Sequence, residues 1–233
     1  MIQRRETRFD HKGRSHVCQL VFDDAKSGPR PGVLVVPAFM GLKAFELEQA
    51  EKLAALGYAA LAVDYYGNGE TTEEMEVAAG WMGALMQDRA DFLARFEGAL
   101  AALKAAPEVD EDRTAAIGYC LGGKAVLDLA RSGADVAAVV SLHGVYDPPP
   151  GARRPMKASV LLLHGWDDPL ATPKDVEAIA AELTETCGDW SLLAFGGTGH
   201  AYTNPANAPA ANGMGYVKTS ADRSWEAMTR FLE

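Results

Sequence analysis

The sequence predicts an α/β fold in which a mostly parallel central sheet carries helices on both faces. Short apolar runs recur along the 233 residues, and most lack the apolar–polar alternation of a half-exposed strand. Segments with helical spacing lie between these runs, so that strands and helices alternate. No linker or repeat divides the chain, and we therefore expect one domain over residues 1–233.

Seven apolar runs are predicted strands. The first, residues 16–22, alternates in part and is predicted to be an antiparallel edge strand. The others are nearly continuous in apolar residues, which is typical of strands buried on both faces. In chain order the runs are residues 16–22, 32–37, 58–64, 114–119, 136–143, 158–164 and 190–195.

Five segments between the strands are predicted helices, and residues that begin or end helices mark several of their limits. Gly57 and Pro107 end two of them. Thr172 and Pro173 open a third, as its cap and its first residue. The predicted helices are residues 44–56, 88–106, 121–131, 172–186 and 219–232.

Charge and composition exclude several classes of function. The net charge of -10 disfavours nucleic acid and anionic membranes as partners, because both require clustered positive charge. The N-terminus has no apolar core of a signal peptide, and no apolar run approaches the ~18 residues of a membrane span. We expect a cytoplasmic monomer that binds neither nucleic acid nor membrane.

Three cysteines, an odd number, show no metal-ligand spacing. This favours a reducing compartment over a disulfide framework, and we expect neither a metal nor another cofactor. Cys18 and Cys187 are expected to be small apolar fillers of the core. Cys120 differs from both, because it stands between glycines.

Residues 118–123, G-Y-C-L-G-G, place Cys120 where a predicted strand turns into a helix. The pattern is that of a nucleophile elbow with cysteine in place of serine. Glycines on either side would let neighbouring segments approach a strained turn without Cβ clashes. The following helix would direct its N-terminus at the sulfur and favour the thiolate. The alternative is a buried cysteine beside packing glycines.

Two later strand ends carry an acid and a histidine. Asp168 follows the run that ends at His164, in the pattern G-x-x-D-P, and neighbouring Asp167 is expected to be a solvated turn residue. His200 follows the last strand in the glycine-rich segment G-G-T-G-H-A. Because the carboxyl ends of parallel strands meet at one edge of a sheet, we expect Cys120, Asp168 and His200 to lie together.

Together, G-Y-C-L-G-G, the G-x-x-D-P loop and G-H-A-Y-T-N-P resemble the dienelactone hydrolase family, over a stretch from about residue 15 to the end. The order nucleophile, acid, histidine is that of α/β-hydrolases. The resemblance implies the α/β-hydrolase fold and hydrolysis of a small ester, lactone or thioester through an acyl-thioester. It implies that Cys120 is the nucleophile, His200 the base and Asp168 its orienting acid. It also implies oxyanion donors at the N–H groups of Leu121 and Phe39.

Two positions depart from the family pattern. Ala38 stands where the best-studied members have an activating glutamate, and residues 201–205 lack the arginine that holds a substrate carboxylate. We therefore expect a substrate without that charge. Several aromatic and small residues near strand ends are candidates to line its pocket: Ala38, Tyr66, Trp81, Tyr119, His143, Tyr146 and Tyr202.

Three other functions remain compatible with the sequence. A binding protein of the same fold could retain the three residues without their chemistry. A redox sensor would use Cys120 as a reversibly oxidised thiol, with Cys18 or Cys187 as its partner. An acyltransferase would share the first half-reaction with a hydrolase, so the sequence does not separate the two.

Overall fold

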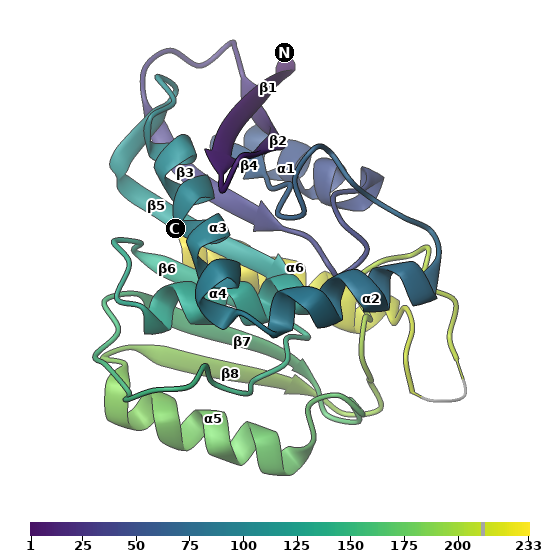
Figure 1. Cartoon of the computed structure of the whole chain (residues 1–233). Coiled ribbons are helices and arrows are strands. Elements are labelled where there is room, and N and C mark those ends of the chain that lie inside the picture. The colour runs from purple at the N-terminus through teal and green to yellow at the C-terminus, as the bar shows by residue number, and fades with distance from the viewer. Residues whose placement is uncertain (211–212) are drawn as a thin grey trace. The chain divides into compact units, whose positions relative to one another are not determined.

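The computed structural model describes residues 1–210 and 213–233, which form two compact units, Met1–Ile117 and Gly118–Glu233. Within the described residues, eight strands and six helices alternate along most of the chain, which confirms the predicted α/β class. Figure 1 shows their course from the N-terminus to the C-terminus. The expectation of a single domain stays a prediction.

The first unit is built on strands β1 to β5. Strands β1 and β2 are antiparallel, β2 is antiparallel to β4, and β3 is parallel to β4. Their order within the unit is β1-β2-β4-β3-β5. The strands are β1 (Ile2–His11), β2 (Arg14–Asp23), β3 (Arg30–Val36), β4 (Ala59–Ala62) and β5 (Val109–Tyr119), the last of which ends just beyond the unit.

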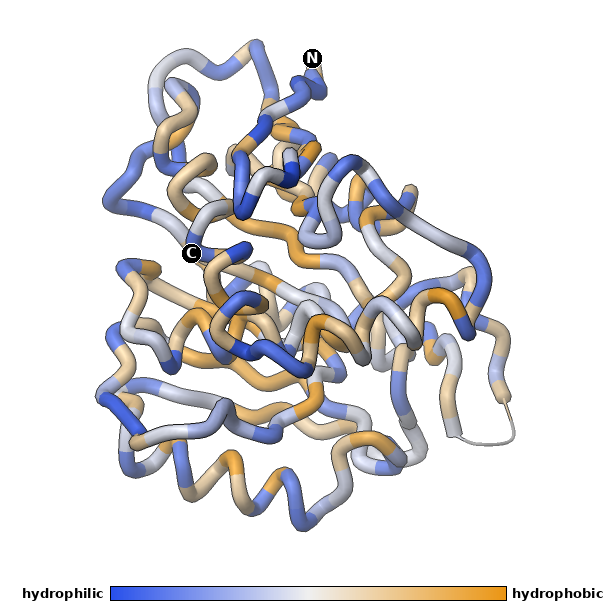
Figure 2. Tube along the Cα trace, viewed as in Figure 1, coloured by the Kyte–Doolittle hydropathy of each residue, from blue (hydrophilic) through white to orange (hydrophobic). Residues whose placement is uncertain are grey.

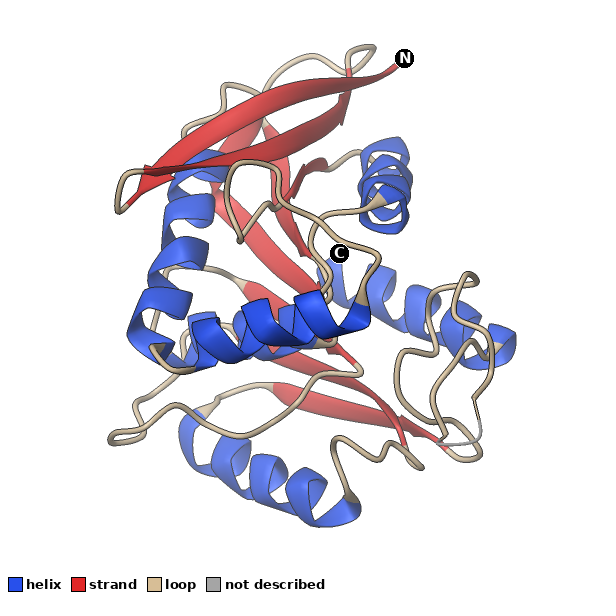
Figure 3. Cartoon of the chain, turned by 45° about the vertical axis from the view of Figure 1, so that its right-hand side comes forward, coloured by secondary structure: helices blue, strands red, loops and turns tan. Residues whose placement is uncertain are grey.

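Three helices complete this unit: α1 (Ala44–Leu56), α2 (Met75–Met86) and α3 (Arg89–Lys104). Helix α1 packs on β2, β3 and β4, and α3 packs on β1 and β3. Figure 3 shows these two helices on opposite sides of the strands. Helix α1 ends at Gly57, whose φ of 108° favours glycine.

Strand β1 was not expected from the sequence. Its residues are mostly charged and exposed, so they give little of the apolar signal that predicts a strand. A two-residue turn, Lys12 and Gly13 with φ of 47° and 76°, joins it to β2, as in a type I′ hairpin. Residues 16–22 lie in β2 and are antiparallel, as predicted, but the predicted edge position is wrong because β1 lies outside them.

Helix α2 was also missed, and its composition explains why. It contains Gly80 and Gly83, and glycine costs about 1 kcal/mol relative to alanine in a helix interior. Most of its apolar residues are exposed or half-buried, and only Ala78 and Leu85 are buried. Neither composition nor spacing therefore predicts it strongly.

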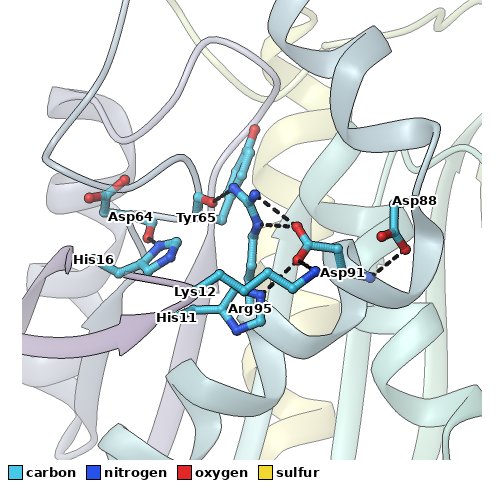
Figure 4. Close-up of polar contacts among 8 residues, drawn as sticks. All are labelled: His11, Lys12, His16, Asp64, Tyr65, Asp88, Asp91 and Arg95. Carbon is cyan, nitrogen blue, oxygen red and sulfur yellow. Dashed lines mark hydrogen bonds and ion pairs between the residues drawn. The ribbon is translucent and has the colours of Figure 1, made fainter. Parts of the chain in front are cut away.

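A polar cluster fixes the hairpin turn to α3 (Figure 4). Asp91, near the start of α3, accepts contacts from His11 Nε2 at 2.8 Å and from Lys12 Nζ at 2.6 Å. Arg95 contacts the same carboxylate through Nε and Nη2 and donates Nη1–H to the carbonyl of Tyr65 at 2.9 Å. Burial raises the pKa of Asp91, but hydrogen bonds from Lys12, His11 and Arg95 outweigh it and hold that pKa well below its usual range.

The second unit contains a parallel run of three strands, β6 (Ala138–Leu142), β7 (Ser159–Gly165) and β8 (Trp190–Phe195). Helix α4 (Leu121–Arg131) packs on β6, and α6 (Lys218–Leu232) packs on β6 and β7. Figure 1 shows α4 in front of these strands and α6 behind them. Helix α5 (Pro173–Thr186) joins α4 through a buried ion pair, Arg131 Nε with Glu182 Oε1 at 2.7 Å.

Figure 2 shows hydrophobic residues gathered along the inner strands of each unit. Strands β3 and β4 are almost wholly buried in the first unit, as are β6 and β7 in the second. Because β6, β7 and β8 are parallel, their carboxyl ends share one edge. The second unit therefore has a single edge at which side chains from three strand ends can meet.

Candidate active site

Cys120 lies at a strained turn between β5 and α4. Its φ of 53° and ψ of -112° lie outside the usual regions for a side-chain-bearing residue, which costs about 1–3 kcal/mol. A Cβ at Gly118 would lie 2.1 Å from the carbonyl oxygen of Gly122, so only glycine fits there. The steric argument made from the sequence is confirmed at this glycine.

The backbone around Cys120 is held on both sides. Its N–H donates to the carbonyl of Leu142 at the end of β6, at 3.0 Å, and its own carbonyl accepts the N–H of Lys124 at 3.2 Å. Cys120 is partly exposed, whereas Cys18 and Cys187 are buried. Leu121 is the first residue of α4, where backbone N–H groups have no partner within the helix. This is the position that the sequence assigns to an oxyanion donor.

Asp168 lies in the loop after β7 and is 2% exposed. Its Oδ2 lies 2.7 Å from Nδ1 of His200, and its Oδ1 accepts the N–H of Leu170 at 2.8 Å. Asp167 is exposed and donates its N–H to the carbonyl of Thr198. Of the two neighbouring aspartates, only Asp168 contacts the histidine.

His200 follows β8 and is buried between a carboxylate and a sulfur. Burial lowers its pKa, but the charge of the Cys120 sulfur and the hydrogen bond with Asp168 outweigh this effect and raise the pKa to about 10. Nε2 of His200 has no hydrogen-bond partner among the described residues. The charge of Cys120 favours the protonated form of the His200 imidazole.

The glycines of the histidine loop allow close approach. A Cβ on Gly165, at the end of β7, would lie 2.3 Å from the carbonyl oxygen of Gly199 and 2.6 Å from that of Thr198. The loop that carries His200 therefore lies directly against the end of β7, just before Asp168. Close contact of two backbones at this point brings the acid and the histidine together.

Four of the predicted pocket residues belong to the second unit, and all four are buried. The His143 ring centroid lies 5.1 Å from that of His200, 5.3 Å from that of Tyr202 and 6.1 Å from that of Tyr119. Tyr146 instead packs on His164, whose Nδ1 lies 3.2 Å from its hydroxyl. Whether any of them contacts a substrate stays a prediction.

The other predicted residues belong to the first unit. The ring centroids of Tyr66 and Trp81 lie 5.1 Å apart. Tyr66 donates its hydroxyl to the carbonyl of Phe39 at 2.7 Å, and Tyr65 donates to the carbonyl of Ala38 at 2.6 Å. Because the C=O and N–H of one peptide point in opposite directions, Tyr65 fixes the direction of the Phe39 N–H.

Glu46 was not singled out from the sequence. It is buried in α1, and burial raises its pKa to about 7. Its carboxylate accepts the backbone N–H of Lys43 at 3.2 Å and also binds the N–H of Ala38. The signal that could have found it is its place three residues into α1, where an acid closes a capping box.

In residues 1–210 and 213–233, no three histidine, cysteine or carboxylate side chains gather as a metal ion requires. None of the helices within these ranges has the length and apolar character needed to cross a bilayer.

Comparison with known proteins identifies relatives over nearly the whole chain. The model of the dienelactone hydrolase family matches residues 19–233. A solved structure titled m3DLH is 38% identical, with a TM-score of 0.95, and the alignment covers 99% of this chain and 97% of that one.

Two further relatives carry functional names. A dienelactone hydrolase-like promiscuous phosphotriesterase from metagenomic libraries is 35% identical, with a TM-score of 0.92 and the same coverage of 99% and 97%. A protein of Methylorubrum extorquens, named provisionally as a carboxymethylenebutenolidase, is 27% identical over 76% of this chain and 65% of its own length.

Proposed function

Because the chain belongs to the dienelactone hydrolase family and is a hydrolase of that type, we propose that it cleaves an ester, lactone or thioester through Cys120, His200 and Asp168. The single observation that carries the proposal is the position of His200. Its Nδ1 lies 2.7 Å from Asp168, and the charge of Cys120 acts on its other side. This arrangement suits a histidine that holds a proton taken from the thiol and later returns it.

The reaction would proceed in two halves. The Cys120 thiolate attacks the carbonyl carbon, and the bond between that carbon and the leaving oxygen or sulfur breaks as His200 gives its proton to the leaving group. Water, deprotonated by His200, then attacks the acyl-thioester and releases the acid and the thiol. We assign the developing oxyanion to the N–H groups of Leu121 and Phe39, each worth about 3 kcal/mol by analogy with measured donors.

Intact mass and product release test this assignment together. The enzyme is mixed with p-nitrophenyl acetate, its mass is recorded, and p-nitrophenol is followed by absorbance. We expect an added acetyl group on the wild type but not on Cys120→Ala, and slower turnover in His200→Ala. Cys187→Ala is the matched control, because it removes a thiol without affecting the predicted site.

An acetyl group on Cys120→Ala, or equal turnover by all variants, would contradict the proposal. If acetate esters give no adduct, the same mass measurement is repeated with neutral lactones of different ring size. A wild type that forms no adduct with either class would favour a binding protein that retains the three residues without the chemistry.

We propose that the substrate is uncharged. The position that carries an activating glutamate in the best-studied relatives is Ala38, and residues 201–205 contain no arginine. A carboxylate on the substrate would therefore lack the cation that neutralises it there. Turnover of a dienelactone carboxylate well above that of matched neutral esters would contradict this assignment.

A phosphotriester is a second candidate substrate, favoured by the 35% identity to the phosphotriesterase over 99% of this chain. Attack of the Cys120 thiolate on phosphorus would expel a phenolate and leave a phosphoryl-thioester, which water would then cleave. Diethyl p-nitrophenyl phosphate should release p-nitrophenol from the wild type and not from Cys120→Ala. Equal release by both proteins would contradict this second assignment.

A further inference from the structure

His143 is the first residue beyond β6, and its backbone is held in an unusual conformation. Its φ of 39° lies in the left-handed region, where a residue with a side chain is strained and persists only if its surroundings hold it. Its N–H donates to the carbonyl of Leu163 in β7 at 2.8 Å. The preceding residue, Leu142, accepts the N–H of Cys120. The end of β6 therefore holds Cys120 at the turn before α4 and also positions His143.

The His143 side chain contacts three residues of the histidine loop. Its ring plane is tilted by 72° to that of His200 and by 73° to that of Tyr202, with ring centroids 5.1 and 5.3 Å apart. Its Nε2 lies 2.8 Å from the hydroxyl oxygen of Thr203. A single ring thus contacts three residues of the loop turn that begins with the predicted base.

The ring of His143 is neutral. Burial lowers its pKa well below the usual range for histidine, and the charge of His200 lowers it further. Its Nδ1 is buried and has no hydrogen-bond partner among the described residues. The hydroxyl of Thr203 accepts from or donates to Nε2, so the contact holds the neutral ring in either tautomer. His143 therefore neither repels the imidazolium of His200 nor takes its proton.

We propose that His143 is a positioning residue for His200. The hydrogen bond to Asp168 holds His200 at one atom, Nδ1, and leaves its ring able to rotate about that contact. The neutral ring of His143, fixed by Thr203 and by the end of β6, removes this freedom and keeps Nε2 of His200 toward Cys120. The inference rests on the proposed function, because it gives His200 the role of the base.

The pH dependence of Cys120 alkylation tests this role without any substrate. Wild type and His143→Asn are treated with iodoacetamide from about pH 5 to 10, and the modified cysteine is located by peptide mass. Asparagine tolerates left-handed backbone, so the variant removes the ring without adding strain. We expect alkylation about tenfold slower at acid pH in the variant, and nearly equal rates where the thiolate forms unaided.

Hydrolysis of a neutral ester gives a second measurement. In His143→Asn we expect kcat to fall about tenfold while KM stays within about twofold, because substrate contacts remain and the base is displaced. His16→Asn is the matched control. His16 is another buried histidine with an unpartnered Nε2, but it stacks on Phe9 in the first unit. It should lower the melting temperature and leave the alkylation profile unchanged.

A folded His143→Asn with both kcat and the alkylation profile within twofold of wild type would overturn the proposal. If that variant does not fold, the same alkylation profile is measured for Thr203→Val. It removes only the hydrogen bond to Nε2, and a smaller shift in the same direction supports the role, whereas an unchanged profile overturns it. If the wild type hydrolyses no ester, the proposed function is contradicted but this proposal is not. The alkylation profile would still show whether His143 positions His200.

Discussion

At the scale of single residues, Asp167 and Asp168 are adjacent in sequence and lie in different surroundings. Asp168 is 2% exposed and its carboxylate accepts from the backbone N–H of Leu170 and contacts His200. Asp167 is exposed and uses only its backbone N–H in the loop. Substitution of Asp168 therefore has a matched control in the same substitution of Asp167.

Asp168→Asn should lower kcat for ester hydrolysis by roughly 10²–10⁴-fold, because an amide does not stabilise the imidazolium or hold the correct tautomer. Asp167→Asn should stay within about twofold of wild type. Steady-state kinetics with p-nitrophenyl esters measures both variants. Equal losses in the two would show that the loop, and not the Asp168 carboxylate, supports His200.

Gly118 carries a second prediction at this scale. Gly118→Ala places a Cβ 2.1 Å from the carbonyl oxygen of Gly122, a backbone atom that does not move without opening the elbow. We expect a loss of about 2–3 kcal/mol in the free energy of unfolding, measured by urea denaturation. Gly188→Ala is the control, because a Cβ there meets nothing within 4 Å. Unfolding midpoints that agree for the two variants would contradict the steric argument.

At the scale of elements, one carboxylate of α3 holds the turn of the β1–β2 hairpin. Asp91 contacts His11 and Lys12 at the hairpin turn, and Arg95 on its own helix (Figure 4). Removal of the Asp91 charge leaves Arg95 without its carboxylate partner and frees the hairpin turn from α3. Because β1 is mostly charged and buries little apolar surface, polar contacts such as this one contribute to its attachment.

Asp91→Asn should reduce the free energy of unfolding by about 2 kcal/mol near neutral pH. The pKa of Asp91 is held below its usual range in the folded chain, so its contribution is present above the unfolded pKa of about 4 and is lost as the pH falls. The difference from wild type should therefore shrink in acid. Glu48→Gln, an exposed change on α1, is the control. A difference that is constant from about pH 7 to pH 3 would contradict this account.

At the scale of the whole molecule, the net charge and the scattered apolar surface predict a monomer. The chain carries a net charge of -10, which opposes association of identical copies. Its exposed large apolar side chains are spread over several elements, among them Met75 in α2 and Trp166 after β7. Equilibrium sedimentation should give a mass close to 24.8 kDa. A mass twice that value, independent of salt, would contradict the prediction.

The sequence by itself determined the alternation of strands and helices and the three residues offered as nucleophile, acid and base. Buried strands and helix caps depend on local composition and spacing. The G-x-C-x-G pattern predicts a turn too crowded for a Cβ, and the close approach of Gly118 to Gly122 confirms it. The sequence missed β1 and α2, because charged or glycine-containing elements depend on neighbours that are distant in the chain. Their formation is a tertiary effect.

The tertiary structure alone decided which groups meet. It placed the His143 ring against His200 by bringing residues 143 and 200–203 to one edge of the parallel strands. It also brought His11, Lys12 and Arg95 to the carboxylate of Asp91. Each of these contacts depends on burial and distance between residues far apart in sequence. The spacing of residues along the chain predicts neither their burial nor the distance between them in the fold.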